Sequence, residues 1–289
     1  MNKKYTVVGL GEVLWDMLPG GKMLGGAPVN FAYHAAQLGA TGVAISSVGN
    51  DDLGREIHNV VDEKEIVNCI SVNLHPTGTV GVTLKDGIPD YTIYENVAWD
   101  FIELTDEAVA NLKKADAVCF GTLAQRGKVS HKAILTALKL VPIKCLKVYD
   151  INLRQNYYSI DLIKESLENS NVFKINDEEL EVFKQLFGLK GEEVEVCLNI
   201  MDTYSISYLA LTKGDKGSYL FGKEEISFVD TPVVEVEDTI GAGDSFTSTM
   251  VMGILNQLPL RAIHEKAVQV SAFVCTQKGA TPVLPEGLF

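Results

Sequence analysis

The chain has 289 residues, of which 46% are hydrophobic, and a formal net charge of −13 at pH 7. So acidic a chain lacks the basic surface that binds nucleic acid through its phosphates, and we expect no nucleic-acid partner. No apolar run is long enough to cross a bilayer, so we expect no membrane partner and a cytoplasmic location. The hydrophobic content suffices for a large core, and we predict a single domain over residues 1–289.

Short apolar, β-branched runs alternate with helix-like stretches along the chain. Such runs fit parallel strands buried on both faces, and the alternation predicts an α/β layered core whose mostly parallel central sheet is flanked by helices. Predicted helices include residues 28–38, with proline in the first turn, and 105–114, with a threonine that can cap it. The predicted strands are residues 5–8, 43–48, 117–120, 146–149, 171–175 and 208–211.

A pair of glycines opens the first predicted helix. Gly25 and Gly26 precede this helix, and Asn30 lies one turn inside it. Paired glycines let a polar ligand approach the backbone, and the amide of Asn30 can both donate to hydroxyl groups and accept from them. A tight turn with a helix cap would use the same residues, so the segment by itself leaves both interpretations open.

Residues 79–84 and 91–94 have the pattern of two strands that flank a turn at Asp86-Gly87. This pattern predicts an antiparallel hairpin. With the segment that follows the first strand, the hairpin would form a small antiparallel β lid from about residues 12–25 and 75–100. An ordinary surface hairpin is the alternative.

The strongest local signal is the segment Asp238-Thr239-Ile240-Gly241-Ala242-Gly243-Asp244, which leads into apolar residues at helical spacing. Backbone N–H groups in a Gly-Ala-Gly turn can approach an anion, because no large side chain intervenes, and the helix dipole favours negative charge. The segment therefore predicts a phosphate site. We also expect these N–H groups to hold Asp244 ionised, ready to take a proton from an alcohol, although an ordinary helix cap looks similar.

Together, the two glycine-bearing segments resemble both signatures of the ribokinase/PfkB family of sugar kinases. The resemblance covers nearly the whole chain, from residues 9–16 to 278–280. Within the family, Asp150-Ile151-Asn152-Leu153-Arg154 is similar to the Asp-x-Asn-x-Arg strand end of fructokinases. One departure is Thr249, which stands where the family usually has a small Ala or Gly and puts the local packing of the helix in doubt.

The resemblance implies ATP-dependent phosphorylation of a primary sugar hydroxyl, and fructose is the sugar that we expect first. Asp244 would be the catalytic base, and the N–H groups of Gly241, Ala242 and Gly243 would stabilise the phosphoryl charge. Arg154 would bind the transferring phosphate or the sugar. Ribose, 2-keto-3-deoxygluconate or a nucleoside could replace fructose, because a few pocket side chains decide hydroxyl recognition.

The resemblance also implies binding residues. The sugar-binding positions, besides Asp244, would be Asp16, Gly25, Gly26, Asn30, Tyr94 and Asn152. The nucleotide-binding positions would be Asn176, Thr212, Gly214, Gly217, Gly241, Gly243 and Gly279. Glu179 would help to place Mg²⁺ through water, and Asp238 and Ile240 would contact a monovalent cation, for instance K⁺. Capping and turn roles would explain several of these residues equally well.

Three other classes of protein are weighed against this kinase. A dinucleotide oxidoreductase is disfavoured because Leu14 stands where its fingerprint needs a third glycine after Gly9 and Gly11, and a P-loop kinase because its motif is absent. A non-catalytic sugar or nucleotide sensor remains the alternative from another class, since a fold alone does not establish activity. An exposed edge of the lid sheet would be protected by pairing across a two-fold axis, so we expect a homodimer.

Overall fold

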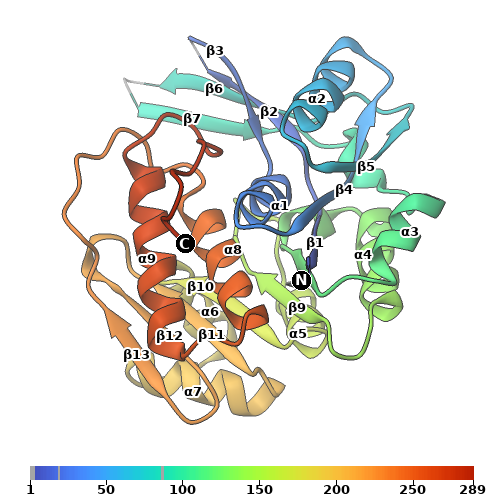
Figure 1. Cartoon of the computed structure of the whole chain (residues 1–289). Coiled ribbons are helices and arrows are strands. Elements are labelled where there is room, and N and C mark those ends of the chain that lie inside the picture. Colours follow the sequence, from blue (N-terminus) through green and yellow to red (C-terminus); the bar gives the residue numbers. More distant parts are fainter. Residues whose placement is uncertain (1–3, 19, 86–87) are drawn as a thin grey trace.

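A nine-stranded sheet forms the centre of the computed structural model, which describes residues 4–18, 20–85 and 88–289, with the backbone alone for 82–85 and 88–91 (Figure 1). Its strands are β1 (Thr6–Leu10), β4 (Thr41–Gly49), β5 (Val67–Asn73), β8 (Ala117–Phe120), β9 (Leu146–Asp150), β10 (Val172–Asn176), β11 (Tyr208–Thr212), β12 (Ser218–Phe221) and β13 (Ile226–Val229). Their order is β13-β12-β11-β10-β9-β8-β1-β4-β5. All neighbours from β11 to β5 pair in parallel, and β12 and β13 are antiparallel.

Each predicted strand coincides with a strand of this sheet, so the mostly parallel α/β core is confirmed. The sequence patterns did not indicate β5, β12 and β13, which lie at the two ends of the sheet. The edge strands β5 and β13 have partly exposed positions, so they lack the continuous apolar run that marks a central strand.

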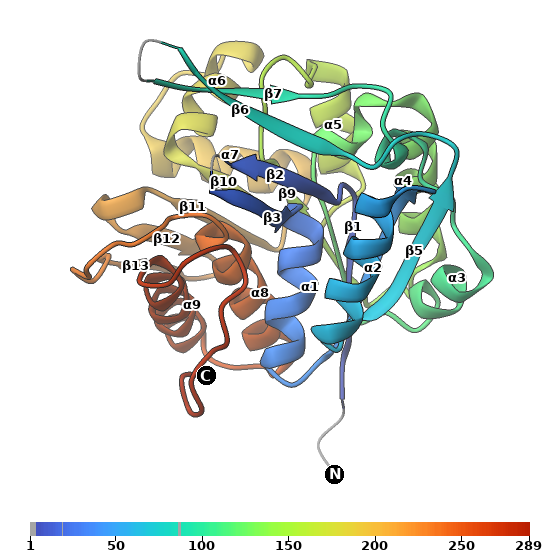
Figure 2. The ribbon, with the colours of Figure 1, turned by 90° about the horizontal axis from the view of Figure 1, so that it is seen from above.

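Helices cover both faces of the sheet (Figures 1 and 2). One face carries α1 (Ala27–Gln37), α2 (Asp52–Glu63), α8 (Ala242–Leu255) and α9 (Leu260–Cys275), and the other carries α3 (Asp106–Leu112), α4 (Lys128–Leu140), α5 (Ile160–Glu168), α6 (Asp177–Phe187) and α7 (Glu193–Tyr204). Separate clusters of buried apolar residues join each layer to the sheet. Thr105 caps α3 as predicted, because its hydroxyl accepts the Ala108 N–H at 3.1 Å.

The direction in which the chain builds the sheet reverses at β1. From β1 the chain adds β4 and β5 on one side, and it later adds β8, β9, β10 and β11 on the other. In open parallel sheets such a reversal leaves a crevice outside the carboxyl ends of the strands, and ligands bind there. The topology therefore places a binding site near the ends of β1 and β8.

A second sheet stands off the first, beyond the carboxyl end of β1 (Figures 1 and 2). In the described part of the chain its four strands are β2 (Leu14–Leu18), β3 (Gly21–Gly25), β6 (Thr79–Lys85) and β7 (Ile88–Ile93), in the order β3-β2-β6-β7. The predicted small sheet is thus present, as two antiparallel hairpins, but β2 and β6 join them in parallel. The turn predicted at Asp86-Gly87 lies outside the described residues.

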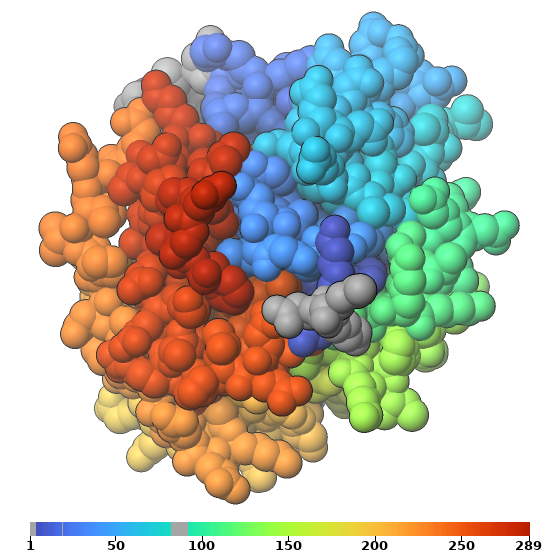
Figure 3. Space-filling view, in the orientation of Figure 1, coloured from blue at the N-terminus to red at the C-terminus, as the bar shows by residue number. Residues whose placement is uncertain are grey.

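The C-terminal segment packs on α1, and Figure 3 shows it in red beside the blue surface of that helix. Gln37 at the end of α1 holds it from both sides. Its side-chain amide donates to the Pro282 carbonyl at 2.9 Å and accepts the Leu284 N–H at 2.8 Å. Among the described residues, no helix is both long and apolar enough to span a membrane.

Candidate active site

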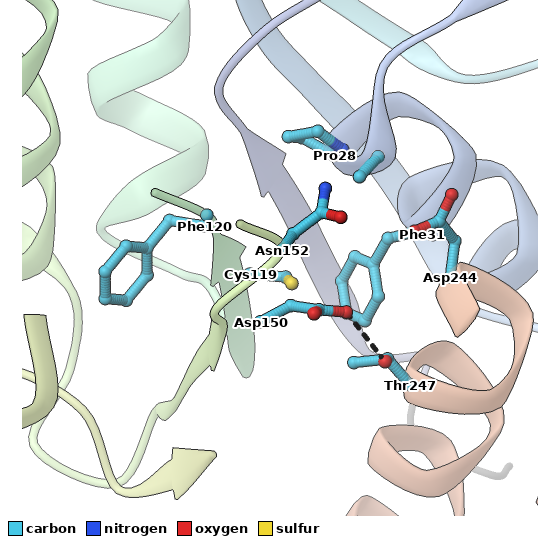
Figure 4. A pocket seen from close by; sticks show the side chains of 10 residues that line it. Pro28, Phe31, Cys119, Phe120, Asp150, Asn152, Asp244 and Thr247 are labelled. Carbon is cyan, nitrogen blue, oxygen red and sulfur yellow. Dashed lines mark hydrogen bonds between the residues drawn. The ribbon is translucent and has the colours of Figure 1, made fainter. Parts of the chain in front are cut away.

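A small pocket lies where α1 and α8 meet the carboxyl ends of β8 and β9 (Figure 4). Two predicted site residues, Asn152 and Asp244, line it together with Asp150, which begins the same motif as Asn152. The rest of the lining includes Phe31, Cys119, Phe120 and Thr247. The pocket therefore occupies the crevice that the strand order predicts, with carboxylates on an otherwise largely apolar lining.

Asp244 lies in the first turn of α8, and Asn30 of α1 holds its side chain. The Asn30 Nδ2 donates to Asp244 Oδ2 at 2.8 Å, although the two residues are 214 positions apart. The Asn30 Oδ1 is buried and has no hydrogen-bond partner in the described part of the chain. A buried carbonyl oxygen needs a donor, so this atom is suited to accept a hydrogen bond from a bound hydroxyl.

The acidity of Asp244 differs from the sequence-based expectation that N–H groups would hold it ionised. Burial, and next the negative charge of Asp150, raise its pKa to about 6, against the opposing effects of Asn30, Lys174 and Arg154. Burial prevails because the low-dielectric interior disfavours the charged form of the carboxyl group. A pKa just below neutrality suits a general base, which must be ionised at working pH yet keep affinity for a proton.

The loop that begins α8 has the glycine-dependent form expected for an anion site. Gly241 is the N-cap with φ 78°, and a Cβ there would lie 2.6 Å from the Cα of Ala280. Only glycine fits both the conformation and the space. The Ala242 N–H donates to the Thr239 carbonyl at 3.3 Å, so Ala242 is a weaker candidate for binding phosphate than the loop as a whole.

On its other side this loop borders a cleft of about 470 Å³. The cleft brings together the predicted nucleotide residues Thr212, Gly214, Gly217 and Gly243. Apolar side chains line much of the rest, including Val234, Val236, Phe246, Val268 and Ala272. Glycine backbone together with apolar side chains matches what a phosphate chain and a purine base require.

Asn176 and Glu179 do not line this cleft. They form a capping box at the start of α6, in which Asn176 Oδ1 accepts the Glu179 N–H at 2.8 Å and Glu179 Oε2 accepts the Asn176 N–H at 2.9 Å. The other oxygen of Glu179 accepts the Leu153 N–H at 2.9 Å. Glu179 thus connects the segment after β9 to α6. These hydrogen bonds support the interpretation of Asn176 and Glu179 as capping residues. The described residues contain no group of three His, Cys, Asp or Glu side chains arranged to hold a metal.

Asp16 lies beside Gly25, the first of the two glycines before α1. The Asp16 carboxylate contacts the position that a Cβ on Gly25 would occupy, and a Cβ on Gly26, where φ is 119°, would contact the Glu12 carbonyl. Burial raises the pKa of Asp16, and the positive charge of Arg154 partly offsets this. The missing side chains therefore make room for a carboxylate beside the start of α1.

Tyr94 and Arg154 do not line the small pocket that contains Asp244. Tyr94 is 50% exposed, and its ring lies against Gly81 within the small sheet. Arg154 is exposed, and its Nη1 donates to the Leu153 carbonyl at 2.9 Å. Its charge nevertheless lowers the pKa of Asp16 and of Asp244. The Tyr91 side chain is outside the described residues.

The Asp238 side chain joins Ile240, which precedes the glycine loop, to Gly279 of the C-terminal turn. Asp238 Oδ1 accepts the Ile240 N–H at 2.9 Å and Oδ2 accepts the Gly279 N–H at 3.2 Å. Gly279 directly precedes Ala280, the residue that contacts Gly241. The Asp238 carboxylate thus fastens the C-terminal turn to the start of the glycine loop.

The sequence patterns missed two charged side chains at the site. Glu12 is 3% exposed, and burial raises its pKa to about 7. Lys174 is a lysine inside the buried strand β10, and its Nζ pairs with Asp150 Oδ1 at 3.1 Å. A charged residue within a run that otherwise predicts a buried strand was the available signal. The unusual Thr249 fits well, because it is fully buried and donates to the Ser245 carbonyl at 2.8 Å.

Sequence comparisons identify one family. The model of the pfkB family carbohydrate kinases matches residues 20–287. A protein of Pyrococcus horikoshii named as an uncharacterized sugar kinase is 29% identical over 89% of this chain and 82% of its own. Fructokinase-2 of Zea mays is 27% identical over 96% of this chain and 91% of its own. An ATP-dependent 6-phosphofructokinase of Thermoanaerobacterium thermosaccharolyticum is 27% identical over 99% and 92%.

Solved structures show the same fold. The Pyrococcus horikoshii sugar kinase in complex with ATP superposes with a TM-score of 0.79, at 26% identity, over 95% of this chain and 94% of that one. The ATP-bound fructokinase of Xylella fastidiosa superposes with a TM-score of 0.84 over 97% and 95% of the two chains. At 20% identity the latter likeness concerns the fold alone.

Proposed function

The chain belongs to the pfkB family of carbohydrate kinases, and we propose that it transfers the γ-phosphoryl group of ATP to a primary hydroxyl of an uncharged sugar, with fructose as the first candidate. One observation carries the proposal. The consecutive residues Gly243 and Asp244 line different cavities, the large cleft and the small pocket. A nucleotide phosphate in the cleft and a hydroxyl beside Asp244 would therefore meet across the first turn of α8, as phosphoryl transfer requires.

Asp244 would accept the hydroxyl proton as the sugar oxygen attacks phosphorus. Its position is fixed by the hydrogen bond from Asn30, and the free Oδ1 of that amide could accept a second sugar hydroxyl. The N–H groups at the start of α8 would stabilise the charge on the phosphoryl oxygens, since the first turn of a helix leaves them without partners inside the helix. Positioning and electrostatics would supply most of the rate.

The charges beside the pocket favour a neutral acceptor. The carboxyl groups of Asp16 and Asp244 lie by the start of α1, Asp16 beside Gly25 and Asp244 on the Asn30 amide, and the buried Glu12, with a pKa of about 7, adds further negative charge when it is ionised. Carboxylates accept hydrogen bonds from sugar hydroxyls and repel a second phosphate. We therefore place an unphosphorylated sugar ahead of a sugar phosphate.

The residues present fit magnesium that is held through water. Both oxygens of Glu179 accept backbone N–H groups, yet a carboxylate has further lone pairs for a water of the hydrated ion. When bound with ATP, the ion neutralises charge on the phosphate oxygens. Glu179 and Asn176 would orient that hydrated ion, and the carboxylate of Asp238 with the Ile240 carbonyl would hold a monovalent cation beside the glycine loop.

The acceptor is tested by measuring ADP formation with Mg-ATP. The panel contains fructose, ribose, 2-keto-3-deoxygluconate, adenosine, fructose 6-phosphate and a blank, each in potassium chloride and in tetramethylammonium chloride. We expect fructose to give the highest kcat/KM, fructose 6-phosphate to remain near the blank, and potassium to increase the rate. If ATP binds in calorimetry but every acceptor equals the blank, the protein is a sensor on a kinase fold and the proposal is wrong.

We also propose that two copies pair through their small sheets. The edge strands β3 and β7 each have one side without a strand partner in the described sheet, and Met17 on β2 is 40% exposed. Open edges of this kind are commonly covered by a second chain. Light scattering at micromolar concentration should give about twice the mass of 31.5 kDa; a monomeric mass would contradict the pairing.

A further inference from the structure

A buried ion pair lies beneath the first turn of α8. Lys174 and Asp150 are neighbours across the parallel ladder of β10 and β9, and their side chains are only 8% and 7% exposed. Lys174 Nζ lies 3.1 Å from Asp150 Oδ1. Burial alone would lower the pKa of Lys174, but Asp150 and then Glu179 raise it above its ordinary value, so the lysine is charged.

The pair is connected to the loop that carries Asp244. The Thr247 hydroxyl lies 3.1 Å from Asp150 Oδ2, drawn as a dashed line in Figure 4, and 2.9 Å from the Gly243 carbonyl. One hydroxyl proton thus serves two acceptors, one on the sheet and one in the first turn of α8. The Lys174 ammonium also lies against Gly243, because a Cβ there would be 3.2 Å from Nζ.

We propose that Asp150 and Lys174 are positioning residues for phosphoryl transfer: through Thr247 and Gly243 they hold the first turn of α8 against the sheet, and as an ion pair they fix the balance of charge beside Asp244. Neither residue needs to touch the sugar or the nucleotide. The inference rests on the proposed kinase function, since it assigns a supporting role to residues around its base.

Stability alone does not explain the pair. Removing two charges from water costs free energy that their mutual attraction only partly returns, and apolar side chains of similar size often stabilise a protein as well or better. The strand around Lys174 is otherwise fully apolar up to Asn176. A charged side chain in such a strand, close to the carboxylate of Asp244, indicates that the charge has a functional role.

The two charges act on Asp244 in opposite directions. Among the contributions to its pKa, that of Asp150 raises it and that of Lys174 lowers it. In the described part of the chain, the titratable or charged groups with the main electrostatic interactions with Asp244 include Glu12, Cys119, Asp150, Arg154 and Lys174. Removing one member of the pair leaves the charge of the other uncompensated, so the two removals should have opposite effects.

The test is the pH dependence of kcat/KM for the native protein, Lys174→Met, Asp150→Asn and the double variant. In the native protein kcat/KM should fall as the pH drops through about 6, because protonated Asp244 cannot accept a proton. We expect the midpoint of this fall to rise by about one pH unit in Lys174→Met and to drop by about one unit in Asp150→Asn. The double variant should return toward the native midpoint, since it removes both charges.

A matched control is the ion pair of Arg126 and Asp100. Its atoms lie 2.7 Å apart and its side chains are 6% and 7% exposed, so its burial resembles that of Lys174 and Asp150. Neither residue is among the main contributions to the pKa of Asp244. Asp100→Asn should therefore lower the melting temperature without moving the midpoint.

Titration by ¹³C NMR of aspartate-labelled protein provides a readout that needs no turnover. The Asp244 signal is assigned by its loss in Asp244→Asn, and its midpoint should shift in the same opposite directions. If no sugar is phosphorylated but the signal shifts as expected, the kinase proposal fails and the charge balance stands. Two conservative variants guard against misfolding: Asp150→Asn keeps the size of the side chain, and Lys174→Arg keeps its charge. If both fold but the Asp244 signal titrates in every variant as it does in the native protein, the positioning role is overturned.

Discussion

Asp244→Asn is expected to lower kcat for sugar phosphorylation by about 10²- to 10⁴-fold, the range typical for loss of a general base. Asparagine retains the size of aspartate and can still interact with Asn30, but it cannot take the hydroxyl proton. The measurement is steady-state ADP formation at saturating sugar and Mg-ATP. ATP affinity measured by calorimetry should change little, because Asp244 lines the pocket on the other side of the loop from the cleft.

The same substitution should stabilise the protein. Folding raises the pKa of Asp244 from 3.8 to about 6, so its ionised form destabilises the folded state at any pH above 3.8, and fully above 6. The rise in melting temperature should grow between pH 4 and pH 6 and then remain constant. Asp161→Asn is the control, because Asp161 is an exposed acid in the first turn of α5. Equal losses of kcat in both variants would refute the assignment of Asp244 as base.

Gly241→Ala is expected to lower kcat by about 10²-fold, comparable to removal of one donor to a developing oxyanion. A Cβ at Gly241 meets the backbone of Ala280, and φ is 78°, so the loop must move away from the C-terminal turn. The N–H groups at the start of α8 move with it and lose their alignment with the phosphoryl oxygens. The measurement combines kcat with the melting temperature.

Gly188→Ala separates conformational strain from loop displacement. Gly188 ends α6 with φ 64°, close to the value at Gly241, but a Cβ there has no atom within 4 Å. It should therefore cost about 1 kcal/mol of stability and leave kcat unchanged. If Gly241→Ala has native kcat, the loop is not the site of phosphoryl stabilisation.

The sequence predicts those strands of the fold in which every residue is buried. Central strands such as β8 and β10 are continuous apolar runs, because helices cover both of their faces. The edge strands β5 and β13 were not predicted, because some of their residues face the core and others face solvent, so their sequences lack a continuous apolar run. The parallel pairing of β2 with β6 was not predicted either, since it joins segments about 60 residues apart that carry no local mark of their pairing.

The sequence by itself determined the family resemblance, the glycine loop and Asp244, because short motifs record the local backbone that a phosphate and a base require. Only the tertiary structure decided that Asn30 holds Asp244, that Glu179 uses both oxygens on backbone N–H groups, and that Lys174 pairs with Asp150. These contacts join residues distant in the chain. They depend on which strands lie side by side and on how deeply each charge is buried. Burial, which a sequence motif does not reveal, also raises the pKa of Asp244 and so makes it suited to the proposed role of base.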